Sequence, residues 1–214
     1  MTAQAVRAVR VKPAARAPRH FWPKVIGLTG AWILAIGPVL ARDPPAPTVS
    51  TQGVGENASI QTRVYFTPWD DAEGAIMRAI RAAKTQVLVQ AYVFTSGPIA
   101  GELINAKKRG IDVRVTADHE QIERISTSRI PDLARAGIPV WAETRYQAAH
   151  NKTMVIDAGG AVPVVITGSY NWTVAAQRRN SENVLILRGA ADLAQAYKAN
   201  WERHRADASP YTPR

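Results

Sequence analysis

Residues 150–172 read HNKTMVIDAGGAVPVVITGSYNW, and this stretch decides both the fold and the function of the chain. Two apolar runs, residues 154–156 and 162–167, flank a glycine-containing segment. Short apolar runs that are separated by a turn signal predict neighbouring strands. His150 and Lys152 precede the first run, whereas residues 168–171 follow the second. The sequence therefore predicts a hairpin-like pair of strands with polar residues gathered at the strand ends.

These polar residues, together with Glu182, form a set that can act on a phosphate. The imidazole of His150 can attack phosphorus, and its spacing from Lys152 places both side chains on one face of an extended segment. Lys152, Ser169 and Asn171 can donate to the phosphate oxygens, on which charge grows in the transition state. The carboxylate of Glu182 can orient the imidazole and favour its charged form.

The pattern H-x-K-x(4)-D, followed by a Gly-Ser pair and an asparagine, resembles the signature of the phospholipase D superfamily. The signature positions are occupied by His150, Lys152, Asp157, Gly168, Ser169 and Asn171. The resemblance extends over about residues 60–206 and is strongest to short, exported, EDTA-resistant bacterial endonucleases that carry one motif per chain. It implies a metal-independent phosphodiesterase that works through a covalent phosphohistidine, without a cofactor.

The role of Asp157 has two interpretations. The signature places it in the catalytic set with His150, Lys152 and Glu182. Its position at the end of a predicted strand favours a structural role instead, as the partner of a surface lysine or arginine. Gly168 is expected to allow close approach of the backbone at a strand end.

A single motif in the chain predicts a homodimer. Cleavage through a phosphohistidine needs one nucleophile and one acid that protonates the leaving oxygen. The chain has four histidines, at positions 20, 119, 150 and 204, and only His150 lies in the phosphate-handling set. In a two-fold dimer, a residue near the axis meets its own copy. We therefore expect the active site at the two-fold interface, with one His150 attacking and the other acting as acid.

The net charge of +10 gives only weak support for a polyanionic substrate. Six of the 27 basic residues, and none of the 17 acidic ones, lie in residues 1–41, so the remainder carries only +4. A mildly basic domain is compatible with nucleic acid but does not require it. The absence of cysteine excludes disulfides, thiolate catalysis and cysteine-bound zinc.

Residues 1–41 predict an export signal. A basic segment precedes the apolar run VIGLTGAWILAIGPVLA at residues 25–41, and small residues there fit a cut after Ala41. The same segment would also serve as an uncleaved N-terminal membrane anchor, although it is short for a span. Both alternatives place the catalytic part outside the cytoplasm, either periplasmic or secreted, or anchored at the inner membrane through residues 25–41.

The rest of the chain predicts one catalytic domain behind a linker. Residues 42–59 are rich in proline, glycine and small polar residues, which is typical of a tether. Residues 60–208 alternate apolar runs with amphipathic stretches, among them helices near 70–84, 98–109 and 192–205. This alternation predicts a three-layer α/β/α sandwich around a mixed, mostly parallel sheet, similar to phospholipase D and with one motif per chain.

Several other polar and aromatic residues have a structural interpretation beside a functional one. For Asp118, His119 and Glu120, helix capping is favoured over metal binding. His204 is expected to be a solvated residue at a basic helix end. Arg178 and Arg179 are candidates for contact with a phosphate backbone. The three aromatic residues that flank the motif, which could stack on bases or pack in the core, are Tyr146, Tyr170 and Trp172.

Two substrate classes are compatible with the sequence. The first is nucleic acid, DNA or RNA, cleaved with low sequence specificity, since no base-reading element is apparent. The second is phospholipid, from which the same chemistry would release the head group. A phosphate-binding module without catalysis is disfavoured, because the residues for every catalytic role are present.

Overall fold

The computed structural model describes residues 48–51 and 60–213. The export signal or anchor predicted for residues 1–41 lies outside this part of the chain. Within the described residues, none of the helices combines the length and the hydropathy that crossing a membrane requires.

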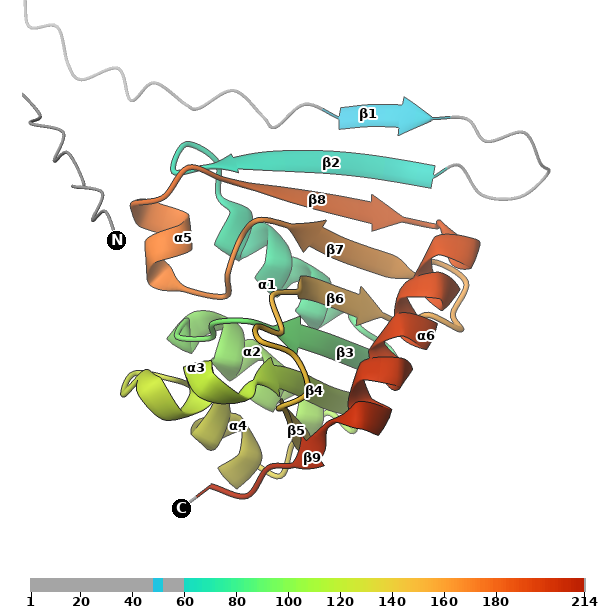
Figure 1. The fold of residues 1–214 in the computed structure, drawn as a ribbon. Helices are drawn as coiled ribbons and strands as arrows, with labels where there is room; N and C mark the ends of the chain where they lie inside the picture. Colours follow the sequence, from blue (N-terminus) through green and yellow to red (C-terminus); the bar gives the residue numbers. More distant parts are fainter. Residues whose placement is uncertain (1–47, 52–59, 214) are drawn as a thin grey trace, which may run out of the picture. The chain divides into compact units, whose positions relative to one another are not determined.

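A single mixed sheet organises the described residues, with the strand order β1-β2-β8-β7-β6-β3-β4-β5-β9 (Figure 1). The strands are β1 (Thr48–Thr51), β2 (Ile60–Thr67), β3 (Gln86–Ala91), β4 (Asp112–Asp118), β5 (Val140–Glu143), β6 (Lys152–Ile156), β7 (Val164–Gly168), β8 (Glu182–Arg188) and β9 (Ser209–Pro210). The predicted mixed α/β class is confirmed. The expectation of a mostly parallel sheet is wrong, because among the described strands only β3–β4 and β4–β5 pair in parallel. Parallel neighbours need long crossovers, and the short connection between β6 and β7 pairs these two strands antiparallel instead.

Helices cover both faces of the sheet and confirm the three layers. They are α1 (Ala72–Ala82), α2 (Gly97–Lys108), α3 (His119–Arg124), α4 (Ile130–Arg135), α5 (Val174–Arg178) and α6 (Ala191–Asp207). In Figure 1, α6 crosses one face of the sheet, while α1 and α2 lie against the other.

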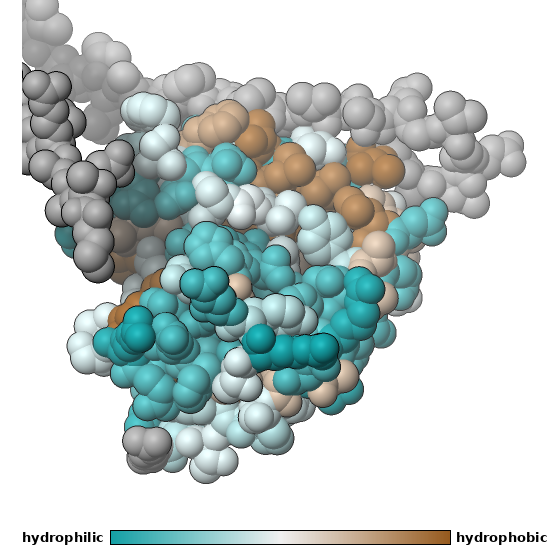
Figure 2. Space-filling view, viewed as in Figure 1, coloured by the Kyte–Doolittle hydropathy of each residue, from teal (hydrophilic) through white to brown (hydrophobic). Residues whose placement is uncertain are grey.

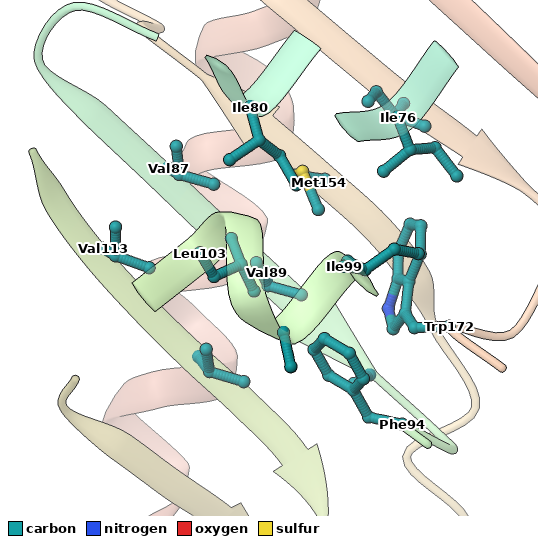
Figure 3. Close-up of a cluster of buried hydrophobic side chains, with 14 of the residues drawn as sticks. Ile76, Ile80, Val87, Val89, Phe94, Ile99, Leu103, Val113, Met154 and Trp172 are labelled. Atoms are coloured by element: carbon teal, nitrogen blue, oxygen red, sulfur yellow. The ribbon is translucent and has the colours of Figure 1, made fainter. Parts of the chain in front are cut away.

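The larger core lies between the sheet and the α1–α2 layer. Apolar residues recur at helical spacing in α1 and α2 and meet alternate residues of β3 and β4. Figure 3 shows Ile80 of α1 and Leu103 of α2 over Val87 and Val113. All four side chains are fully buried, so truncating Leu103 to alanine would cost about 2–5 kcal/mol.

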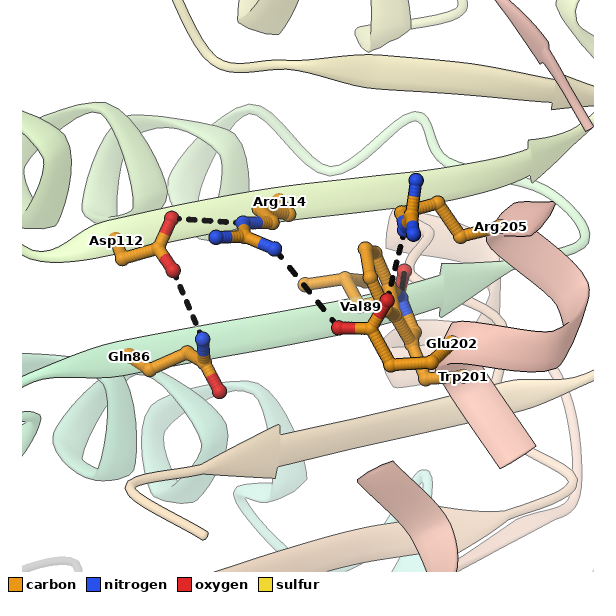
Figure 4. A network of polar contacts seen from close by, with 7 residues as sticks. All are labelled: Gln86, Val89, Asp112, Arg114, Trp201, Glu202 and Arg205. Carbon is orange, nitrogen blue, oxygen red and sulfur yellow. Dashed lines mark hydrogen bonds and ion pairs between the residues drawn. The ribbon is translucent and has the colours of Figure 1, made fainter. Parts of the chain in front are cut away.

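Helix α6 is fixed to the opposite face by one tryptophan. Trp201 is 1% exposed, and its indole N–H donates to the carbonyl of Val89 at 3.0 Å (Figure 4). Beside it, Glu202 of α6 contacts Arg114 of β4, and Arg114 in turn binds Asp112 at 2.9 Å. These contacts hold α6 across the central strands.

Two short strands lie outside residues 60–208, the predicted bounds of the catalytic domain. Residues 48–51, inside the predicted linker 42–59, form β1 and pair with β2. Residues 209–210, beyond the predicted end at 208, form β9 and pair with β5. Both are short edge strands whose sequences lack a strong period-2 pattern, so their place depends on the neighbouring strand and not on local propensity.

The strand directions bring distant parts of the sequence to one end of the sheet. Ala91, at the end of β3, pairs with Lys152 at the start of β6. The end of β7 lies beside the start of β6, and Gly168 pairs with Val184 near the start of β8. We call this end, where β3, β4, β5 and β7 finish and β6 and β8 begin, the site end of the sheet.

Candidate active site

His150 and Lys152 form a contacting pair at the site end. The ammonium nitrogen of Lys152 donates to the backbone carbonyl of His150 at 2.6 Å and lies 2.9 Å from its Nδ1. His150 is exposed, whereas Lys152 is 6% exposed. Burial lowers the pKa of Lys152 to about 8, and the nearby carboxylate of Glu182 opposes this shift.

The contact between the two side chains has a consequence for the protons of the imidazole. A charged Lys152 can only donate, so in a neutral His150 ring Nδ1 is the acceptor and the proton resides on Nε2. In this tautomer Nε2 bears the proton and has no lone pair with which to attack phosphorus. A phosphate that draws the ammonium group away would let Nδ1 carry the proton and leave Nε2 free as a nucleophile.

Ser169, Glu182 and Asn180 form a second cluster. The Ser169 hydroxyl donates to one carboxylate oxygen of Glu182 at 2.5 Å, and the Asn180 side chain donates to the other at 2.9 Å. Ser169 also accepts from the backbone N–H of Asn183 at 3.2 Å. In the described chain, therefore, Glu182 bonds to Ser169 and Asn180 and makes no hydrogen bond to His150, the partner that we expected from the sequence.

Gly168 allows this cluster to form. Its φ is +153°, and a Cβ at this position would lie 2.1 Å from the carbonyl oxygen of Asn183. Any side chain would push β7 away from the start of β8. The expected role of Gly168 in close backbone approach is confirmed.

Asn171 presents an unsatisfied polar group at the same end. Its Oδ1 is buried and has no hydrogen-bond partner among the described residues. The following residue, Trp172, is 1% exposed, and its indole N–H donates to the backbone carbonyl of Gln90. An unpaired buried acceptor costs about 1–3 kcal/mol. Rotation of the carboxamide exchanges its oxygen and its NH₂ group, so Asn171 is available to donate to a phosphate oxygen.

Asp157 does not lie with these residues. It follows the end of β6, so about 16 Å of strand separates it from Lys152. Its carboxylate accepts from the backbone N–H groups of residues 84–86 and from the Thr85 hydroxyl, at 2.7–2.9 Å. Burial opposes ionisation, but these hydrogen bonds outweigh it and lower the pKa of Asp157. Asp157 is therefore a structural residue, and its partners are mainly backbone groups instead of the expected surface cation.

Asp118 is a site residue that the sequence identified only as a helix cap. Capping is confirmed, since one carboxylate oxygen accepts from Gln121 N–H at the start of α3. The other oxygen accepts from Ala149 N–H at 2.8 Å and thereby fixes the backbone next to His150. A carboxylate after a buried strand was the available signal, but its second partner is 31 residues away in the sequence.

The remaining predictions have mixed outcomes. The expectation of a solvated His204 is wrong, because its Nδ1 lies 2.6 Å from a carboxylate oxygen of Glu143, which is 4% exposed.

Of the three aromatic residues that flank the motif, Tyr170 and Trp172 are buried core residues, whereas Tyr146 is 42% exposed. Arg178 is the last residue of α5 and Arg179 caps it, near the site end, and their expected contact with phosphate stays a prediction. In the described ranges, no group of three or more His, Cys, Asp or Glu side chains is placed to hold a metal ion.

Comparison with known proteins gives one consistent family. The family described as "Cardiolipin synthase, PLD-like domain" matches residues 76–205. A phospholipase D of Rickettsia felis is 34% identical over 75% of this chain and 78% of its own length. A mitochondrial cardiolipin hydrolase of Xenopus laevis is 30% identical over 67% of this chain and 65% of its own length.

Solved structures share the fold. Nuc from Salmonella typhimurium, a phospholipase D family member, superimposes with a TM-score of 0.63 at 29% identity, over 72% of this chain and 99% of that one. NucT from Helicobacter pylori gives a TM-score of 0.64 at 21% identity, over 71% and 99% of the two chains. Each of these structures therefore corresponds, over nearly its whole length, to less than three quarters of the present chain.

Proposed function

The chain belongs to the phospholipase D superfamily and is a phosphodiester hydrolase, and from this premise we propose that it is an endonuclease of low sequence specificity that cleaves through a phosphohistidine without a metal ion. The observation that carries this proposal is the pair formed by His150 and Lys152. In this pair, the ammonium nitrogen of the buried Lys152 lies 2.9 Å from Nδ1 of the exposed His150 imidazole.

In the proposed first step, Nε2 of His150 attacks phosphorus. A phosphorus–nitrogen bond forms while the bond from phosphorus to the leaving oxygen breaks. Lys152 and the carboxamide of Asn171 donate to the non-bridging oxygens, where charge accumulates. Ser169 is engaged with Glu182, so it reaches phosphate only when that hydrogen bond is exchanged.

The leaving oxygen needs a proton, and in this proposal the His150 of a second copy supplies it. In the second step, water attacks the phosphohistidine, the phosphorus–nitrogen bond breaks, and the same second histidine takes the proton of the water. The two roles differ only in protonation, and the ring of each copy can adopt either one. The active site then lies at the two-fold axis of a homodimer.

An exposed apolar strip supports the dimer. Strand alternation places Val64 and Phe66 of β2 and Leu185 of β8 on the α6 face of the sheet. Figure 2 shows hydrophobic residues on this face, over β2 and β8 and beyond the cover of α6. Phe66 is 46% exposed. Apolar surface of this kind marks a site of association, and the strip adjoins Glu182 at the site end.

For the substrate, the mildly basic charge and Arg178 and Arg179 near the site end support nucleic acid. Phospholipid is the alternative, and the names of the relatives, phospholipase D and cardiolipin hydrolase, favour it. The chemistry at phosphorus is the same for both substrates. For the location we propose export through residues 1–41, which places the enzyme in the periplasm or outside the cell.

A substrate panel in excess EDTA tests this function. We expect the purified protein to nick supercoiled plasmid, the His150→Ala variant to be inactive, and phosphatidylcholine or cardiolipin vesicles to release little head group. Head-group release without nicking would establish the alternative. Light scattering should find a dimer, and specific activity should fall when dilution dissociates it. Full specific activity in a monomer would contradict the shared site.

A further inference from the structure

Tyr92 contacts both His150 and Lys152, the pair proposed to act on phosphorus. It follows β3 directly, and its neighbour Ala91 pairs with Lys152 across β3 and β6. The Tyr92 ring centroid is 4.3 Å from the imidazole centroid of His150, with 51° between the planes. The ammonium nitrogen of Lys152 lies 4.7 Å from the centroid of the same ring. One aromatic ring therefore contacts both members of the pair.

The ring is itself held in place. Gln121 donates to the phenol oxygen of Tyr92 at 3.2 Å. The backbone N–H of Gln121 is bound by Asp118, which also accepts from Ala149 N–H beside His150. Asp118 thus fixes both the residue that holds the ring and the backbone that carries the histidine.

The imidazole of His150 needs a restraint besides Lys152. His150 is exposed, and in the described chain its ring nitrogens have no hydrogen-bond partner other than Lys152. When substrate draws Lys152 away, the ring would lose that restraint. An aromatic face keeps its contact with an imidazole in either tautomer, and it attracts an ammonium group electrostatically.

We infer that Tyr92 is a positioning residue of the phosphodiesterase: its aromatic ring orients His150 for attack and keeps the Lys152 ammonium charged beside it. This inference rests on the proposed function. It adds a residue outside the His150, Lys152, Ser169, Asn171 and Glu182 set, and this residue acts through the first two of them without touching phosphate.

Two substitutions separate the ring from the hydroxyl. With bis(p-nitrophenyl) phosphate as substrate, Tyr92→Phe keeps the aromatic face and should retain kcat within about threefold. Tyr92→Leu removes the face and should lower kcat at least about tenfold, because a displaced nucleophile loses its orientation. The matched control is Tyr197→Leu, at a partly buried tyrosine that packs on the α6 side of the core, which should leave kcat unchanged.

A second measurement distinguishes positioning from a merely structural effect. Following the Lys152 side-chain carbon signal in NMR against pH, we expect the titration midpoint to lie about 0.5 pH unit lower in Tyr92→Leu than in the wild type. Tyr92→Phe should titrate like the wild type. A midpoint in Tyr92→Leu that is unchanged or higher would overturn the inference, as would unchanged kcat.

If Tyr92→Leu does not fold, Tyr92→Met replaces it. This variant keeps much of the bulk of the side chain without an aromatic face, and it should lower kcat and reduce the ring-current shift of the His150 protons. No change in either quantity would refute the role of Tyr92. If the wild type hydrolyses no phosphodiester at all, the proposed function fails, and the NMR midpoint and ring-current shift still decide the placement of the ring.

Discussion

Replacing Asp157 by asparagine should destabilise the fold while leaving the chemistry intact. The carboxylate accepts three hydrogen bonds at Oδ1 and one from Lys84 N–H at Oδ2. The carbonyl oxygen of an asparagine side chain could keep the three hydrogen bonds made at Oδ1. Its NH₂ group would then face the backbone N–H of Lys84, and two donors cannot form a hydrogen bond. Hydrogen bonds to a charged group contribute about 1.5–3 kcal/mol each. Because the site is partly exposed, we expect a loss of about 2 kcal/mol, near the lower end of this range.

Asparagine is the appropriate replacement because the backbone of Asp157 has φ +50°, a conformation that asparagine tolerates better than most residues. For a domain of this size, about 2 kcal/mol corresponds to a melting temperature lower by about 4–8 °C. Thermal unfolding followed by circular dichroism measures this difference. Glu123→Gln, at an exposed carboxylate of α3, controls for the loss of one negative charge.

The pH dependence of the difference has a defined sign. The pKa of Asp157 is lowered in the folded protein. Its contribution is therefore fully present above the unfolded pKa of about 3.9 and is lost as pH falls through the folded pKa. The gap between wild type and Asp157→Asn should close below about pH 4. A variant with an unchanged melting temperature and a kcat at 25 °C lower by about a hundredfold would refute the structural assignment and return Asp157 to the active site.

Four further outcomes test the same geometry. Since the pKa of Lys152 is about 8, kcat/KM measured from about pH 6 to 10 should fall as pH rises through about 8, where the ammonium group loses its charge. Lys152→Met should abolish turnover yet raise the melting temperature at neutral pH by about 2–4 °C, because it removes a buried charge. His204→Ala should cost about 3 kcal/mol in urea unfolding, since it leaves the Glu143 carboxylate buried and unpaired. Asp118→Asn should raise the activation free energy of turnover at 25 °C by more than it lowers the free energy of unfolding. The reason is that the loop that carries His150 loses its bond from Ala149 N–H.

Local pattern was sufficient for the elements with strong periodicity. The buried runs at β3, β4, β6 and β7 predicted strands, and the apolar spacing predicted a helix near residues 70–84. The structure begins α1 at Ala72, and the Asp71 side chain caps it by accepting from Gly74 N–H at 2.9 Å. The same logic predicted Gly168 correctly, because a glycine at a strand end beside functional residues indicates close packing.

The residues that sequence reasoning missed or assigned wrongly depend on strand register. Tyr92 and Asp118 meet the site only because the ends of β3 and β4 align with the start of β6. Both lie far from His150 along the chain, so no local spacing could pair them with it. His204 was misjudged for the same reason, since its partner Glu143 ends a different element. Side-chain type and local context predict exposure poorly when the partner is this remote.

The directions of the strands at the site bear directly on function, and the predicted hairpin-like pair gave the direction of β6 and β7 correctly. If these two strands were parallel, the start of β6 and the end of β7 would lie at opposite ends, separated by about 16 Å of strand. Lys152 would then be remote from Ser169 and Asn171. The antiparallel order β6-β7-β8 instead reverses the chain twice, so that the start of one strand, the end of the next and the start of the third coincide. These two reversals place Lys152, Ser169 and Asn171 at one end of the sheet, as the proposed binding of one phosphate requires.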